Sequence, residues 1–118
     1  MPLVLLVEDD PDQLALRRMF LEAAGYQVIE ARSAVEANVQ MDASSPNAVV
    51  MDLRIPLRED GFSLLRRLSP RVPVIVLTGS NLHDVDGLPL FRALQKPCPT
   101  PALLEAIQAA VEHHGHLG

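Results

Sequence analysis

The sequence predicts an α/β fold in which a five-stranded parallel sheet lies between two layers of helices. Three observations support this. Short apolar runs rich in Val, Leu and Ile recur along the chain, as is typical of strands buried on both faces. Segments with helix-start signals separate these runs, and this alternation is typical of parallel sheets. With 118 residues, of which 48% are hydrophobic, the chain can bury one core, so we expect residues 1–118 to form a single domain.

The sequence pattern of the N-terminal third of the chain predicts a strand, a helix and a second strand. Leu3–Val7 is the first apolar run, and Asp10 followed by Pro11 predicts the N-cap and first turn of a helix that Gly25 ends. Residues 26–31 predict the second strand. We expect Arg17 and Arg18 to lie on a solvated face of the helix, whose apolar face is formed by Leu16, Met19, Phe20 and Ala23.

The rest of the chain repeats this alternation. A capping-box pattern at Ser33 and Glu36 predicts a helix over residues 33–41. Apolar runs predict strands at 48–51 and 72–77, with a fifth strand at 91–95. A short helix is expected from residue 60 or 61 to 68. The last helix starts at Thr100, and its apolar stripe comprises Leu103, Leu104, Ile107, Ala110 and Val111.

Two segments are expected to be irregular. Gly79, Gly87 and Pro89 interrupt the stretch where the fourth helix should lie, so we expect that helix to be shortened, irregular or absent. Residues 113–118 are expected to form a flexible C-terminal tail.

Charge and composition exclude several classes of function. The net charge of −5 argues against general binding to nucleic acid or to an anionic membrane. No apolar run reaches the roughly 18 residues that a membrane span needs. The single cysteine, Cys98, cannot form an internal disulfide. We therefore expect a cytoplasmic protein without membrane insertion or direct contact with nucleic acid.

Polar side chains follow the predicted strands. Glu8 and Asp9 follow the first, Asp52 the third, Thr78 the fourth and Lys96 the fifth. The carboxyl ends of parallel strands meet at one edge of the sheet, where ligands bind in such folds. Clustered carboxylates favour a hard cation such as Mg²⁺. A carboxylate can also accept a phosphoryl group, whose charge a lysine, a hydroxyl and the cation would stabilise.

Four motifs, each at a strand end and in this order, resemble response regulator receiver domains of two-component signalling. They are Val-Glu-Asp-Asp at 7–10, Met-Asp-Leu-Arg-Ile-Pro at 51–56 with Gly61 downstream, Leu-Thr-Gly at 77–79, and Lys-Pro at 96–97. The resemblance covers nearly the whole chain. It implies a flavodoxin-like, doubly wound, three-layer fold and identifies the single domain as a receiver.

The resemblance also implies roles for individual residues. Asp52 would be the phosphoacceptor, and Thr78 and Lys96 would bind the phosphoryl oxygens. Glu8, Asp9, Asp52 and the backbone carbonyl of Arg54 would hold Mg²⁺. A sensor histidine kinase or a histidine phosphotransfer protein would donate the phosphoryl group, and slow self-hydrolysis would remove it, without enzymatic turnover. A downstream protein or output domain would respond to the change in surface, and a homodimer is compatible with this scheme.

The sequence departs from the family pattern at four places. Glu8 replaces a commoner aspartate, the segment between Asp52 and Gly61 is one residue longer, and the segment between Thr78 and Lys96 is several residues shorter. Ala93 occupies the usual position of the switch aromatic. Phe91 would lie on the same face of a regular strand, so the switch candidates are Thr78, Phe91 and Ala93. These changes favour signalling through another surface or to a partner that recognises an altered one.

Two other functions remain open from the sequence. One is a receiver-like interaction module that works without phosphorylation, which Ala93 and the interrupted fourth helix favour. The other is a small Mg²⁺-dependent aspartyl phosphohydrolase. Such enzymes often carry a second acid two residues after the nucleophile, whereas this chain has Arg54 there.

Overall fold

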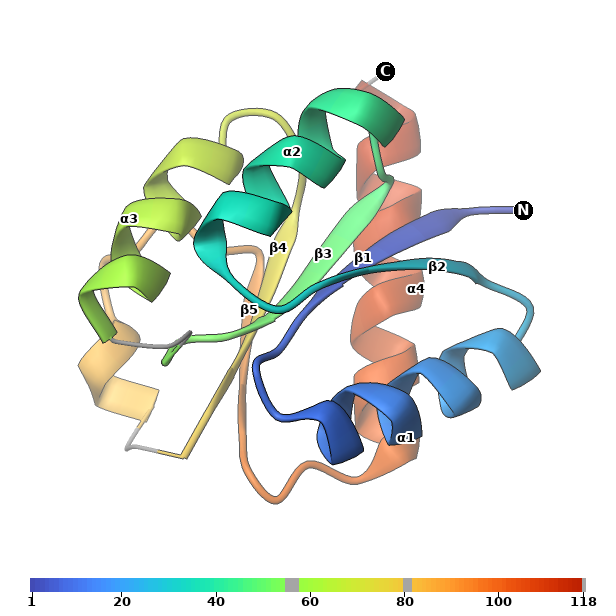
Figure 1. Cartoon of the computed structure of the whole chain (residues 1–118), viewed down its shortest axis with the longest axis horizontal. Helices are drawn as coiled ribbons and strands as arrows, with labels where there is room; N and C mark the ends of the chain where they lie inside the picture. Colours follow the sequence, from blue (N-terminus) through green and yellow to red (C-terminus); the bar gives the residue numbers. More distant parts are fainter. Residues whose placement is uncertain (55–57, 80–81, 118) are drawn as a thin grey trace.

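A computed structural model describes residues 1–54, 58–79 and 82–117. Strands and helices alternate along these residues, as predicted (Figure 1). In chain order, the elements are β1 (Leu3–Val7), α1 (Pro11–Ala23), β2 (Gln27–Ala31), α2 (Ala34–Ser44), β3 (Ala48–Asp52), α3 (Arg58–Leu68), β4 (Val74–Thr78), the 3₁₀ helix η1 (Leu82–Val85), β5 (Arg92–Gln95) and α4 (Thr100–Leu117).

The five strands form one parallel sheet in the order β2-β1-β3-β4-β5. The order reverses after β2, which confirms the doubly wound arrangement. In the register, Val7 pairs with Met51 and Asp52 pairs with Leu77. The last residues of β1, β3 and β4 therefore lie at the same edge of the sheet.

Two apolar clusters, one on each face of the sheet, form the core. Leu14 and Leu21 of α1 pack in one cluster with Ile107 of α4. Ala37 of α2 packs in the other with Leu65 of α3. Because side chains alternate along each strand, both faces of β3 and β4 are covered, and all residues of these two strands are buried. The three-layer prediction is confirmed.

Helix α1 begins as predicted but turns a different face to the sheet. The Asp10 side chain accepts hydrogen bonds from the backbone N–H groups of Asp12 and Gln13, at 2.9 and 3.3 Å. The expected apolar face is wrong, because Leu16, Met19 and Phe20 are 45%, 63% and 39% exposed. The side chains that α1 buries are instead Leu14 and Leu21.

Some boundaries differ from the predicted ones by two or three residues. Helix α2 continues to Ser44, since no glycine or proline stops it before the left-handed Ser45 and Pro46. Helix α3 already includes Arg58. Residues 55–57, which contain part of the segment expected to be one residue longer, lie outside the described residues.

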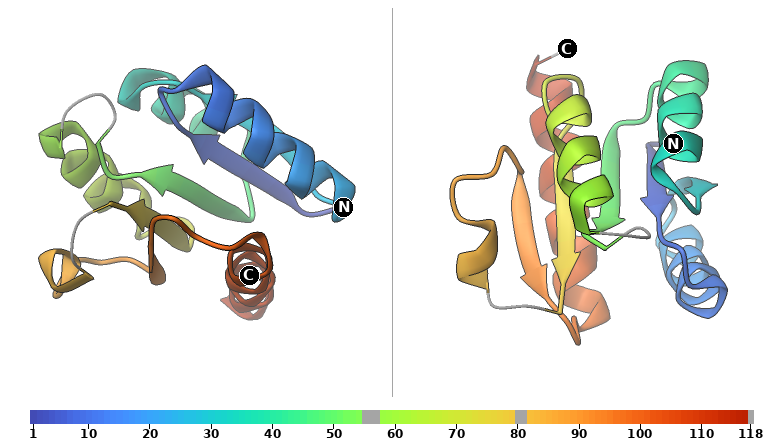
Figure 2. Two further views of the ribbon diagram at one scale, coloured as in Figure 1. Left: turned by 90° about the horizontal axis from the view of Figure 1, so that it is seen from below. Right: turned by 60° about the vertical axis from the view of Figure 1, so that its left-hand side comes forward.

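The prediction of a shortened, irregular or absent fourth helix is confirmed for the described residues. Between β4 and β5 these contain a 3₁₀ helix of four residues, η1, at the β5 edge of the sheet (Figure 2). Gly87 has a positive φ of 80°, a conformation that glycine adopts at little cost. Val85, Leu88 and Leu90 pack against the core on the α2–α3 side. An irregular apolar segment thus covers this end of the sheet.

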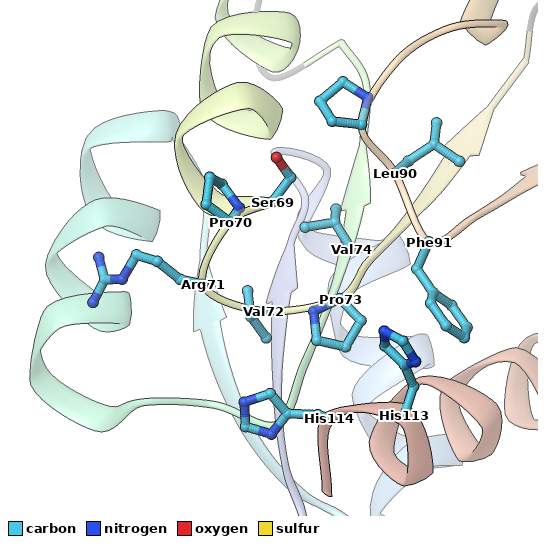
Figure 3. Close-up of a pocket in the computed structure, with 11 residues that line it drawn as sticks. Ser69, Pro70, Arg71, Val72, Pro73, Val74, Leu90, Phe91, His113 and His114 are labelled. Atoms are coloured by element: carbon cyan, nitrogen blue, oxygen red, sulfur yellow. The ribbon is translucent and has the colours of Figure 1, made fainter. Parts of the chain in front are cut away.

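The expectation of a flexible tail needs correction, because α4 continues through Leu117. The His113 ring lies 5.2 Å from the Phe91 ring, measured between centroids, so its turn of the helix packs against the segment before β5. Both side chains line a pocket of about 560 Å³ at the amino edge of the sheet, together with Val72, Pro73 and His114 (Figure 3). Residue 118 lies outside the described residues.

Among the described helices, none combines the length and the apolar character that crossing a bilayer requires.

Candidate functional site

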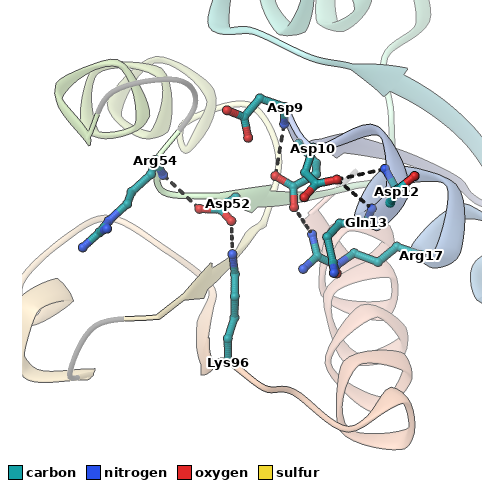
Figure 4. A network of polar contacts seen from close by, with 9 residues as sticks. Asp9, Asp10, Asp12, Gln13, Arg17, Asp52, Arg54 and Lys96 are labelled. Carbon is teal, nitrogen blue, oxygen red and sulfur yellow. Dashed lines mark hydrogen bonds and ion pairs between the residues drawn. The ribbon is translucent and has the colours of Figure 1, made fainter.

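Asp52 is the last residue of β3 and is 7% exposed. Its Oδ2 accepts a hydrogen bond from the Lys96 ammonium, and its Oδ1 accepts one from the backbone N–H of Arg54 at 3.0 Å (Figure 4). Since β3 is paired on both sides, by β1 and β4, the backbone that carries this carboxylate is held firmly. The arrangement presents a buried, oriented anion at the carboxyl edge of the sheet.

Glu8 and Asp9 follow β1 at the same edge but differ in exposure. Glu8 is 3% exposed, and its Oε2 accepts a hydrogen bond from the Asp9 N–H at 3.0 Å. Its Oε1 accepts a hydrogen bond from Nη1 of Arg17 at 2.8 Å. Asp9 is exposed, and the neighbouring Asp10 caps α1. The acidic triplet thus divides into a buried acid, an exposed acid and a helix cap.

Glu8 lies in an unfavourable place for a negative charge. Burial is the main cause that raises its pKa, and the negative charge of Asp52 raises it further. The positive charges of Arg17 and Lys96 lower the pKa of Glu8, but they do not offset these two effects. Two carboxylates that repel each other at a sheet edge would be stabilised by an additional cation.

Thr78 and Lys96 lie at the same edge of the sheet, at the ends of the adjacent strands β4 and β5. Thr78 ends β4 and is buried, and its carbonyl accepts a hydrogen bond from the Lys96 N–H at 2.7 Å. This bond extends the β4–β5 ladder by one residue and places Lys96 beside Asp52. Leu77 and Gly79, on either side of Thr78, both line the groove around the site.

Five of the predicted site residues line one groove of about 790 Å³, whereas Thr78 is not among its lining residues. Its lining includes Glu8, Asp9, Asp52, Arg54 and Lys96. The structure therefore places these five residues around one groove at the carboxyl edge of the sheet. Their roles toward phosphate and metal, including that of the Arg54 carbonyl, stay predictions.

The donor set suits Mg²⁺ in part. Carboxylate oxygens are the ligands this ion prefers, and it needs only one or two of them because it keeps several waters. Within the described ranges, no group of three or more acidic, histidine or cysteine side chains is already arranged to hold a metal. The site therefore fits a partly hydrated cation, provided that Glu8 can be released from Arg17.

The expected relation between Phe91 and Ala93 is wrong. β5 begins only at Arg92, so Phe91 lies outside the regular alternation of the strand. Phe91 packs against the cluster on the α1–α4 side of the sheet, whereas Ala93 packs on the α2–α3 side. Phe91 is therefore not placed as a same-face replacement for an aromatic at position 93.

The sequence analysis missed Arg17. It was assigned to a solvated face, but its side chain is only 13% exposed and pairs with Glu8. The spacing from Leu14 to Leu21 carries the missed signal, since residue 17 falls between them on the same helical face. A basic residue on the inward face, in the second turn of the helix that follows an acidic strand end, indicates an ion pair.

Comparison with known sequences identifies a protein family that this chain matches. A family model described as response regulator receiver domain matches residues 4–108. The chain is 34% identical over 116 residues to the transcriptional regulatory protein GlrR of Escherichia coli (strain K12), which covers 92% of this chain and 26% of that protein. It is 33% identical over 121 residues to the transcriptional regulatory protein PrrA of Mycobacterium tuberculosis (strain ATCC 25618 / H37Rv), covering 97% and 52%. The chain thus spans a quarter to a half of the length of these relatives.

Solved structures agree in fold. The signal receiver domain of an HD domain-containing protein from Pseudomonas fluorescens Pf-5 has a TM-score of 0.87 at 28% identity and covers 98% of each chain. A CheY-like response regulator receiver domain protein from Methanospirillum hungatei JF-1 has a TM-score of 0.87 at 25% identity and covers 100% of this chain and 99% of that one. The sheet order, the acidic groove and these matches together show that the chain belongs to the response regulator receiver domain family.

Proposed function

We propose that Asp52 accepts a phosphoryl group, in a Mg²⁺-dependent reaction, from a phosphohistidine of a sensor kinase or phosphotransfer protein. The observation that carries this proposal is the buried Asp52 carboxylate, held between the Lys96 ammonium and the Arg54 N–H and opening onto a groove with three further acids, Glu8, Asp9 and Asp10. The product would act by changing the surface that a downstream protein or output domain contacts.

The reaction can be written for the residues of this chain. A carboxylate oxygen of Asp52 attacks phosphorus, the P–N bond to the donor imidazole breaks, and the electron pair stays on the imidazole nitrogen. The Lys96 ammonium would then donate its hydrogen bond to a phosphoryl oxygen in place of the Asp52 carboxylate. Asp52 pairs with Leu77 in the register, and Thr78 is the next residue of β4. Its hydroxyl would donate a hydrogen bond to a second phosphoryl oxygen. When bound by Glu8, Asp9, Asp52 and the Arg54 carbonyl, Mg²⁺ would neutralise the remaining negative charge.

Metal removal tests this proposal directly. Intact mass would be measured after incubation with phosphoramidate, once with Mg²⁺ and once with a chelator. We expect one phosphoryl adduct that requires Mg²⁺, and fragmentation should locate it on the peptide that contains Asp52. A folded protein that stays unlabelled in both conditions, beside a receiver that is labelled, would refute the proposal and favour the phosphate-independent module.

Replacing Lys96 with methionine should slow labelling strongly without unfolding the protein. Loss of one charged donor to developing negative charge typically lowers a rate by about 10²–10³. The Lys96 side chain is 32% exposed, so methionine keeps much of its packing, and at saturating Mg²⁺ the cation would compensate the Asp52 carboxylate that loses its ammonium partner. Initial rates of adduct formation at saturating Mg²⁺ measure the effect. Lys96→Arg, which keeps the charge, serves as the comparison, and an unchanged rate in the methionine variant would exclude Lys96 from the reaction.

The altered end of the sheet favours an unusual output surface. Where a regular fourth helix was expected, the described residues contain the 3₁₀ helix η1, and β5 carries Ala93 instead of an aromatic. We propose that the downstream partner recognises this altered face or another surface of the domain. The longer relatives are named transcriptional regulatory proteins. An output domain in the whole protein, a homodimer and a cytoplasmic location are further parts of this proposal.

A further inference from the structure

Arg17 is a charged side chain in a place where helices normally bury apolar ones. It lies on the inward face of α1 between Leu14 and Leu21, which are 5% and 0% exposed. The Arg17 side chain itself is 13% exposed. Arginine is rarely this buried without a partner, since an unpaired buried charge is costly. The position therefore needs an acidic partner inside the domain.

That partner is Glu8, which is also one of the acids proposed to bind the cation. Arg17 Nη1 lies 2.8 Å from Glu8 Oε1, and the Asp9 N–H occupies the other oxygen at 3.0 Å. Both oxygens of Glu8 are thus hydrogen-bonded within the protein. A divalent cation that takes Glu8 directly, or through one of its waters, would bind to the same carboxylate as the Arg17 guanidinium. Two cations on one carboxylate repel each other, so the two interactions compete.

Each of the two buried acids of the site thus has one of the protein's own cations as a partner. Arg17 pairs with Glu8, and Lys96 pairs with Asp52. Arginine keeps its charge throughout the accessible pH range, so this competition is present whenever Glu8 is ionised. The neighbouring Arg18 is different, because it is 40% exposed and pairs with Glu22 and Glu30, away from the groove.

We propose that Arg17 is a tethered counter-ion of the cation site, meaning a side-chain cation that holds Glu8 in the metal-free protein and leaves it when Mg²⁺ binds. This inference rests on the proposed function, because it concerns the same acidic pair. It makes Arg17 a positioning residue that weakens Mg²⁺ binding and keeps the metal-free acidic site compact and stable.

The test compares Mg²⁺ affinities of Arg17→Met, Arg17→Lys, Arg18→Met and the unmodified chain, by NMR titration of the backbone amides of Asp9 and Arg54. We expect Arg17→Met to bind Mg²⁺ about tenfold more tightly than the unmodified chain, which corresponds to about 1.4 kcal/mol. Arg17→Lys should restore most of the original affinity. Arg18→Met removes the same formal charge from the same helix and should change the affinity by less than about twofold at physiological ionic strength.

A second readout needs no variant. The side-chain Nε–H signal of Arg17 in the unmodified chain should shift in step with Mg²⁺ saturation, while that of Arg18 should not. If Arg17→Met does not fold, this titration and Arg17→Lys still decide the matter.

Three results would overturn the inference. The first is unchanged or weaker Mg²⁺ binding in Arg17→Met accompanied by a lower melting temperature, since this would show a merely structural ion pair. The second is an Arg17 signal that does not respond to Mg²⁺. The third is the absence of Mg²⁺ binding in all four proteins. This last result differs from the other two, because it would remove the proposed cation site itself.

Discussion

Replacing Asp52 with asparagine is expected to abolish phosphoryl labelling while the protein stays folded. The amide has nearly the same size as the carboxylate, and its oxygen can still accept a hydrogen bond from Lys96, so the buried site remains filled. It lacks the anionic oxygen that attacks phosphorus, and no other atom of the side chain replaces it. Intact mass after incubation with phosphoramidate and Mg²⁺ should show labelling only at the background level.

Asp42→Asn provides the matched control. Asp42 is an exposed carboxylate on α2 that pairs with Arg71 at 2.9 Å, remote from the groove. This variant should be labelled as fully as the unmodified chain, which separates a lost nucleophile from a general change in charge. If Asp52→Asn were labelled to the same extent as Asp42→Asn, another side chain would be the acceptor.

Replacing Gly61 with alanine is expected to cause the largest loss of stability from a single added methyl group. A Cβ at Gly61 would lie 1.7 Å from the carbonyl oxygen of Leu53, the residue directly after β3. The neighbour is backbone, so no side chain can rotate away, and α3 or the end of β3 must shift. Overpacking of this kind typically costs 1–3 kcal/mol, and about 3 kcal/mol is expected here because both partners are buried.

Gly115→Ala is expected to change the free energy of unfolding in the opposite direction, and it serves as the comparison for Gly61→Ala. Gly115 lies within α4, and a Cβ there would meet nothing within 4 Å. Alanine should therefore stabilise the protein by about 0.5–1 kcal/mol through its better helix propensity. Urea unfolding of both variants gives the free energies of unfolding. A Gly61→Ala protein as stable as the unmodified chain would show that the close approach of α3 to Leu53 is not tightly constrained.

The strands and the positions of the site residues were predictable because the same sequence pattern, an apolar run ended by a polar residue, indicates both. A parallel strand buried on both faces is a continuous apolar run, so its end is marked by the first polar residue. Asp52, Thr78 and Lys96 were found in this way, and the sheet order places all three at the same edge of the sheet without further information. The interrupted fourth helix was predictable for a similarly local reason, since glycine and proline act on the backbone where they stand.

The errors concern which face a side chain turns to. On α1 the exposed face is more apolar than the buried one, so hydrophobicity alone selected Leu16 and Met19 and assigned Arg17 to solvent. Only the tertiary contact with Glu8 shows why Arg17 is buried. Phe91 was misplaced because the alternation of side chains along β5 was assumed to include Phe91, which lies one residue before the strand begins at Arg92. The contact of His113 with Phe91 joins segments distant in the chain, and no local pattern indicates it.

The sheet order has a consequence for local stability. β3 lies between two strands and is wholly buried, whereas β5 is an edge strand of four residues that is only partly buried and follows an irregular segment. Edge segments with few buried contacts open at lower free energy than central strands, and they can do so while the rest stays folded. Asp52 therefore belongs to the part of the domain that opens last. Lys96, its partner across the groove, follows a short edge strand, so the two halves of this ion pair should differ in how readily their amide hydrogens exchange with water.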